Sequence, residues 1–84
     1  MKERIKKVEQ VLQKILLERE CPLNIANWLE VELDELFPFD CAIQDFVTEL
    51  ALYQPRGGEF LINEEELIKR CESILSYIVE INRL

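Results

Sequence analysis

Histidine is absent from the sequence. Because histidine is the usual base beside a catalytic serine or cysteine, its absence removes the Ser-His and Cys-His pairs that most often activate a nucleophile. It also removes the Glu-x-x-His motif of di-iron helical bundles. The sequence therefore predicts a protein that is not an enzyme and has no cofactor.

Cysteines and long apolar runs are also scarce. Cys21, Cys41 and Cys71 lie 20 and 30 positions apart without a CxxC pair, so we expect reduced thiols rather than a disulfide framework or a zinc ribbon. The longest apolar run, residues 50–53, is far shorter than the ~20 residues of a membrane span. The basic start MKERIKK leads into charged residues rather than the apolar core of a signal peptide. We therefore expect a cytoplasmic protein that does not enter a membrane.

Basic residues are missing from the middle of the chain. No lysine or arginine occurs between Glu20 and Pro55, whereas residues 1–7 carry four bases and one acid. The net charge of −7 gives a field that repels nucleic acids and anionic lipids. We therefore expect the partner to be a basic or neutral protein, or a second copy of the chain. The acids of this base-free block are Glu20, Glu30, Glu32, Asp34, Glu35, Asp40, Asp45 and Glu49.

Apolar residues recur at steps of three and four, which predicts helices near residues 2–20, 23–37, 40–54 and 63–83. Pro22 and Pro55 are expected to end the first and third helices, because proline has no amide donor. Asp40 is expected to cap the third helix, and Asn63 with Glu66 forms a capping-box pattern before the fourth. Short connections make consecutive helices neighbours. The prediction is one all-α domain, residues 1–84, folded as a small four-helix antiparallel bundle.

Two segments allow a second interpretation. Residues 29–34 alternate apolar and acidic side chains, as a half-buried strand would, but the length of the segment and its Leu and Glu content favour a helix. Residues 59–62 are either a short extended segment that lies across the helices or an apolar binding edge.

Arg56, Gly57 and Gly58 lie between the third and fourth helices. Glycines there are expected to make a turn, because a turn often needs positive φ angles. The alternative is an anion-binding nest of glycine amides with Arg56. The segment lacks the phosphate-loop pattern and follows no strand, so the turn is favoured.

The acidic block either keeps one side of the bundle solvated or docks a basic protein. For docking, we expect electrostatic steering followed by burial of a few apolar anchors. In size, acidity and helicity the chain resembles the small inhibitor or immunity proteins that cover basic toxins, a likeness of character that assigns no residue roles. The predicted partner-binding residues are Trp28, Glu30, Val31, Glu32, Asp34, Glu35, Asp45 and Glu49.

Two alternatives belong to other functional classes. The first is a structural homo-oligomer, in which the apolar stripe of the first helix or the Trp28 and Val31 stripe of the second forms the seam. The second is a phosphate-processing enzyme with Mg²⁺ or Mn²⁺ held by carboxylates at helical spacing, such as Glu30 with Asp34. The block contains no base that could hold a phosphate.

Overall fold

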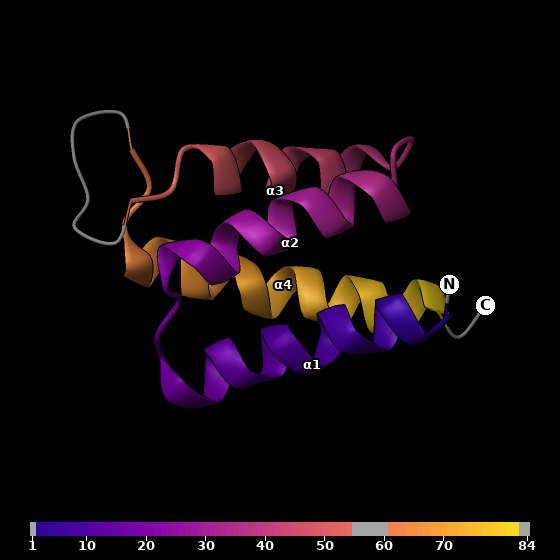
Figure 1. Cartoon of the computed structure of the whole chain (residues 1–84), viewed down its shortest axis with the longest axis horizontal. Helices are drawn as coiled ribbons and strands as arrows, with labels where there is room; N and C mark the ends of the chain where they lie inside the picture. Colours follow the sequence, from indigo (N-terminus) through magenta and orange to yellow (C-terminus); the bar gives the residue numbers. More distant parts are fainter. Residues whose placement is uncertain (1, 55–60, 83–84) are drawn as a thin grey trace.

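The computed structural model describes residues 2–54 and 61–82. This part of the chain folds into four helices: α1 (Lys2–Glu18), α2 (Leu23–Leu36), α3 (Cys41–Ala51) and α4 (Glu64–Asn82). Each helix runs back along the one before it, so that α1 starts and α4 finishes at the same end of the bundle (Figure 1). The predicted all-α antiparallel bundle is confirmed, and α2 is a helix rather than a strand. None of the helices in the described ranges has the length and hydropathy of a membrane span.

The helices associate as two close pairs. Helix α1 packs along α4, and α2 packs along α3, while the contacts from α1 to α2 and from α3 to α4 are fewer. Open hollows lie on the surface of the α2–α3 pair and at the seam where α3 meets α4.

The core contains the apolar stripes that the sequence predicts. Its buried residues come from all four helices, from the α1–α2 connection (Cys21) and from the α3–α4 connection (Tyr53). The described residues include no buried charged side chain. Two cysteines lie in this interior beside the aliphatic side chains. The core residues are Val8, Leu12, Ile15, Cys21, Ala26, Leu29, Leu33, Ile43, Phe46, Leu50, Tyr53, Leu67, Ile68, Cys71, Ile74 and Ile78.

Two helices end two or three residues earlier than predicted. Helix α1 stops at Glu18, because Arg19 takes a left-handed conformation with φ of 57°. Pro22 is not the residue that ends α1; it precedes α2 at the N-cap position. Helix α3 stops at Ala51 rather than near residue 54, since Tyr53 leaves the helix to form a parallel β-bridge with Ile62.

The β-bridge between Tyr53 and Ile62 brings the two ends of the α3–α4 connection together. Gln54 donates its amide to the carbonyl of Ile62 at 2.9 Å, and Ile62 donates to the carbonyl of Leu52 at 3.1 Å. Extended pairing is thus present at Ile62, while residues 59 and 60 of the predicted segment lie outside the described residues.

Both predicted N-caps receive their hydrogen bonds. The amide of Ile43 donates to Asp40 Oδ1 at 3.1 Å, and the amide of Glu66 donates to Asn63 Oδ1 at 2.9 Å. Each bond satisfies an amide of the first helical turn that has no partner within the helix.

Cys21, between α1 and α2, is bonded on both sides of its main chain. Its amide donates to Glu64 Oε2 at 3.1 Å, and its carbonyl accepts from the Tyr53 hydroxyl at 2.5 Å. Cys21 and Tyr53 are buried, so these groups cannot turn to water instead. The α1–α2 connection is therefore tied to the end of α3 and to the first turn of α4.

We expect Tyr53→Phe to lower the free energy of unfolding by about 1–3 kcal/mol, because it leaves a buried carbonyl without a donor. Tyr77→Phe is the matched control: its hydroxyl donates to Asp40 Oδ2 at a part-buried position, where water can replace the lost donor, so we expect a clearly smaller loss. Urea denaturation of the three proteins measures both. Equal losses in the two variants would contradict the structural role of the Tyr53–Cys21 bond.

Burial also predicts that alkaline pH destabilises the fold. It raises the pKa of the Cys21 thiol from 9.0 to about 11 and that of the Cys71 thiol from 9.0 to about 12. The unfolded chain releases these protons at lower pH than the folded chain, so the stabilisation is complete below pH 9.0 and is lost as pH rises through about 11 for Cys21 and about 12 for Cys71. Urea denaturation across this range measures the decline. We expect a shallower decline in Cys71→Ala, and an equal slope in both proteins would refute the assignment.

Candidate partner-binding site

Helix α2 has one buried face and one acidic face. Ala26, Leu29 and Leu33 are buried in the core. On the opposite side Val31 is 57% exposed. The acids around it are exposed or half-buried: Glu30, Glu32, Asp34 and Glu35. We call this surface the acidic face of α2, and it contains five of the eight residues that the sequence predicts for partner binding.

On the side toward α3, the acidic face borders an open groove of about 380 Å³. Val31 from α2 and Val47 from α3 provide its apolar surface. The described residues that line the groove include no lysine or arginine; they are Asn27, Glu30, Val31, Asp34, Glu35 and Val47. The groove thus combines an apolar contact surface with three carboxylates.

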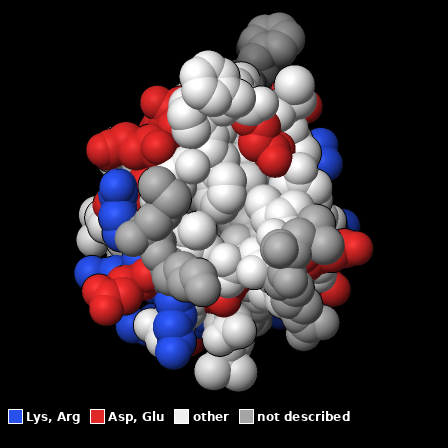
Figure 2. Space-filling model, turned by 90° about the vertical axis from the view of Figure 1, so that its right-hand side faces the viewer, with Lys and Arg blue, Asp and Glu red and all other residues white. Residues whose placement is uncertain are grey.

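On the side toward α1, the acidic face is occupied by bases from the same chain. The Arg4 guanidinium lies 2.9 Å from Glu32 Oε2 and 3.6 Å from Glu35 Oε2. One turn further along α1, the Lys7 ammonium lies over the Trp28 ring, 5.6 Å from its centroid. Figure 2, which faces the end of the bundle where α1 starts, shows basic and acidic side chains side by side along its left edge.

These contacts change the interpretation of Trp28 and Glu32. Trp28 is half-buried beneath Lys7 and belongs to the α1–α2 contact rather than to an open apolar stripe. Glu32 is also half-buried and bound to Arg4. Neither residue is open to a partner in this arrangement unless the α1 side chains move.

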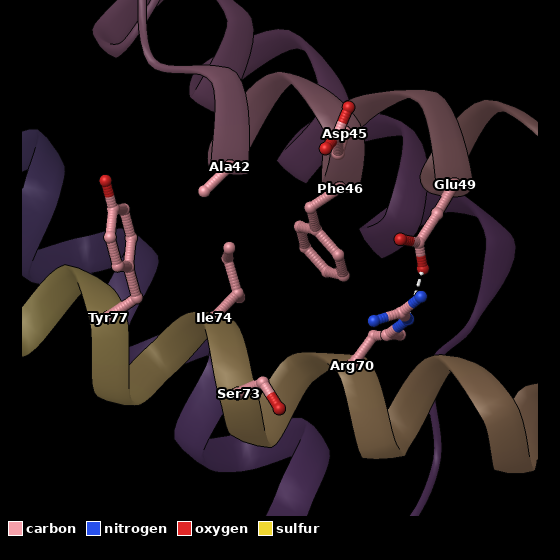
Figure 3. Close-up of a pocket in the computed structure, with 8 residues that line it drawn as sticks. All are labelled: Ala42, Asp45, Phe46, Glu49, Arg70, Ser73, Ile74 and Tyr77. Atoms are coloured by element: carbon pink, nitrogen blue, oxygen red, sulfur yellow. Dashed lines mark ion pairs between the residues drawn. The ribbon is translucent and has the colours of Figure 1, made fainter.

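Asp45 and Glu49 line a different surface, an open pocket of about 340 Å³ between α3 and α4. Figure 3 shows Phe46 and Ile74 pointing toward each other in it, with the Glu49–Arg70 ion pair at one end and Tyr77 at the other. The oxygen–nitrogen distance of the ion pair is 2.8 Å. The predicted site residues therefore fall in three places: the α2–α3 groove, the α1–α2 contact and the α3–α4 pocket.

Asp40 links the α3–α4 pocket to the start of α3. Its second carboxylate oxygen accepts a hydrogen bond from the Tyr77 hydroxyl at 2.7 Å, while its first caps α3. This hydrogen bond raises the pKa of Tyr77, because the carboxylate accepts only from the neutral phenol. Asp40 thus has a structural role that joins α3 to α4.

Four residues of the α2–α3 groove and the α1–α2 contact are not among the predicted ones. Asn27 and Val47 line the α2–α3 groove, and Arg4 and Lys7 contact the acidic face from α1. Asn27 stands four positions before Val31, so helical spacing could have identified it. Arg4 and Lys7 are three positions apart and therefore share a face of α1, but their spacing does not indicate which helix that face meets.

The remaining candidates are the metal site, the glycine loop and the cysteines. Within residues 2–54 and 61–82, no three His, Cys, Asp or Glu side chains gather closely enough to hold a metal ion. Arg56, Gly57 and Gly58 lie outside the described residues. All three cysteines are free thiols; Cys21 and Cys71 are buried and Cys41 is exposed.

Comparison of the chain with protein-family models, with curated proteins and with solved structures finds no match.

The thiols are expected to react in two classes. Cys41 should react with Ellman's reagent in the folded protein, because it is exposed. Cys21 and Cys71 should react only on unfolding, since both are buried out of reach of the reagent and burial also raises the pKa of each thiol. The absorbance change before and after adding denaturant counts the thiols in each class. Cys41→Ser is the control and should remove the fast class alone, and fast reaction of more than one thiol would contradict the burial.

Proposed function

We propose that this protein is a non-catalytic interaction module that binds a basic segment of another protein through the acidic face of α2. One observation carries the proposal: Glu30, Asp34 and Glu35 border a groove whose apolar surface is Val31 and Val47, with no base among its described lining residues. Exposed aliphatic side chains surrounded by charges of one sign are a suitable surface for a partner of the opposite charge.

The mechanism has two stages. The net charge of −7 attracts a cationic segment over distances of about the Debye length, ~8 Å at physiological ionic strength. The groove then covers an aliphatic side chain of that segment, while the carboxylates bind its flanking lysine or arginine side chains. Charge speeds the encounter, and apolar burial with paired charges keeps the partner bound.

The α2–α3 groove is better suited to this role than the α3–α4 pocket. In the pocket, Glu49 is already paired with Arg70, and Phe46 and Ile74 are buried core residues. A cationic partner would have to displace Arg70 there. In the groove, Val31 is more than half exposed, and Glu30 and Asp34 form no ion pair with described residues.

Self-association has less support. The α1 stripe of Val8, Leu12 and Ile15 lies in the core of the bundle, so it is not available as a seam between copies. Arg4 already pairs with α2 of its own chain, so it is not free to attract the acidic face of a second copy. A heterologous basic partner remains the occupant that the charge favours.

The test is a titration of the ¹⁵N-labelled protein with the peptide Arg-Arg-Leu-Arg-Arg, followed by amide chemical shifts at low and at high salt. We expect the largest shifts at Asn27, Glu30, Val31, Asp34 and Val47, and weaker binding at high salt because the ion pairs are exposed. Shifts that concentrate on another surface, or no shifts at all, would refute the proposal. A rise in molecular mass by light scattering without peptide would support self-association instead.

A charge-reversal variant sharpens this test. Glu30→Lys with Asp34→Lys should weaken peptide binding about tenfold at low salt, equivalent to ~1.4 kcal/mol. Glu72→Lys with Glu80→Lys is the matched control, because these exposed acids of α4 change the net charge by the same amount away from the groove. Isothermal titration calorimetry compares the affinities. Equal weakening by the two double variants would mean that only the net charge matters and would exclude a specific groove.

A further inference from the structure

The first turns of α1 place an arginine on the acidic face of α2. The Nε of Arg4 donates to Glu32 Oε2 at 3.0 Å, and its Nη2 lies 2.9 Å from the same oxygen and 3.6 Å from Glu35 Oε2. Glu32 and Glu35 are three positions apart, so one guanidinium reaches both carboxylates from adjacent turns of the helix. The fold thus contains its own example of a basic side chain bound to this face.

We infer that Arg4 is an internal competitor for the acidic face, and that an arginine of a basic partner takes its place between Glu32 and Glu35. The inference rests on the proposed function and adds to it the chemistry of the partner and a means of regulation. In the resting state, Arg4 neutralises the α1 side of the face and leaves the α3 side, with Glu30 and Asp34, open for the first encounter.

The exchange requires only a side-chain movement. The side chains of Arg4, Glu35 and Glu32 are 47%, 52% and 19% exposed, so water reaches each group as they separate. The first buried residue of α1 in the described chain is Val8, one turn beyond Arg4. Helix α1 therefore stays packed in the core while Arg4 turns away. Arg4 lies near the N-terminus of α1, where the positive end of the helix dipole does not stabilise a basic side chain.

The geometry selects arginine over lysine as the exchanging group. A guanidinium presents several N–H donors in one plane and can bond two carboxylates together, whereas an ammonium acts as a compact point charge. Arg4 places both Nε and Nη2 on one oxygen of Glu32, and its Nη2 also lies 3.6 Å from Glu35 Oε2. A partner arginine can reproduce this pair of donors, whereas a partner lysine has a single nitrogen.

The experiment compares peptide affinity for the wild-type chain, Arg4→Ala and Lys14→Ala at low salt. Lys14 is an exposed base on the same helix and forms no ion pair with described residues, so both variants lose one positive charge from α1. We expect Arg4→Ala to bind Arg-Arg-Leu-Arg-Arg about three- to tenfold more tightly than the wild type. Lys14→Ala should gain less than about twofold, because it changes only the long-range field.

Two further measurements separate exchange from a general charge effect. The Nε–H resonance of Arg4 in the wild-type protein should shift during the titration, because the donor loses its bond to Glu32. The gain in Arg4→Ala should be smaller for Lys-Lys-Leu-Lys-Lys than for the arginine peptide. Thermal unfolding of both variants confirms that they are folded before binding is compared.

The possible outcomes test the role of Arg4 separately from the proposed partner-binding function. If the peptide binds the groove but Arg4→Ala and Lys14→Ala gain equally, or Arg4→Ala binds more weakly, the internal competitor is refuted and the proposed function stands. If the wild type and both variants bind no peptide at all, the proposed function fails and the inference fails with it.

Discussion

The bundle depends on how the main chain of Cys21 is satisfied. A connection of four residues joins α1 to α2, and at its centre Cys21 is buried with its amide and carbonyl turned toward the protein. An unpaired main-chain group in such a place would cost as much as a lost hydrogen bond or more. Tyr53 and Glu64 provide the partners from the end of α3 and the start of α4. The same two bonds join all four helices at one end of the molecule, where the Tyr53–Ile62 bridge also lies.

The α1–α2 connection at this end of the bundle determines which residues of α1 and α2 meet at the opposite end. With α1 and α2 joined by a tight connection, the first turns of α1 must lie beside the last turns of α2 (Figure 1). The basic start of the chain therefore meets the acidic half of α2, and Arg4 reaches Glu32. The polarised charge distribution of the sequence is partly neutralised by this topology, but only on the α1 side. The α3 side retains its acids beside Val31 and Val47. The two sides of the acidic face therefore differ in charge, which the composition of the sequence does not indicate.

The fold was largely predictable from the sequence, and the site was predictable only in part. Steps of three and four identified the helices and their buried stripes because those steps bring side chains to one face, and Asp40 and Asn63 marked two helix starts. The stop at Glu18 was not predictable, since Arg19 adopts positive φ without a glycine to signal it. Helical spacing also placed Glu30 and Asp34 on one face of α2, and both line the α2–α3 groove. Helical spacing could not separate Asp45 and Glu49 from these acids of α2. The period of the pattern indicates which residues share a face of one helix, but not which other helix that face contacts.

A link between charge and stability follows from the same geometry. The chain folds with a net charge of −7, and compact folding brings those like charges closer together, which opposes the folded state. The ion pairs seen among the described residues involve Glu32, Glu35 and Glu49, so Glu30 and Asp34 contribute to the repulsion without such compensation. A cationic segment bound in the α2–α3 groove would relieve that repulsion only in the folded chain, because the unfolded chain does not bring the groove residues together. Any ligand that prefers the folded state stabilises it, by an amount that increases with the logarithm of its concentration relative to Kd. On the proposed function, partner binding and folding stability are therefore coupled through the same carboxylates, and salt weakens the attraction and the repulsion together.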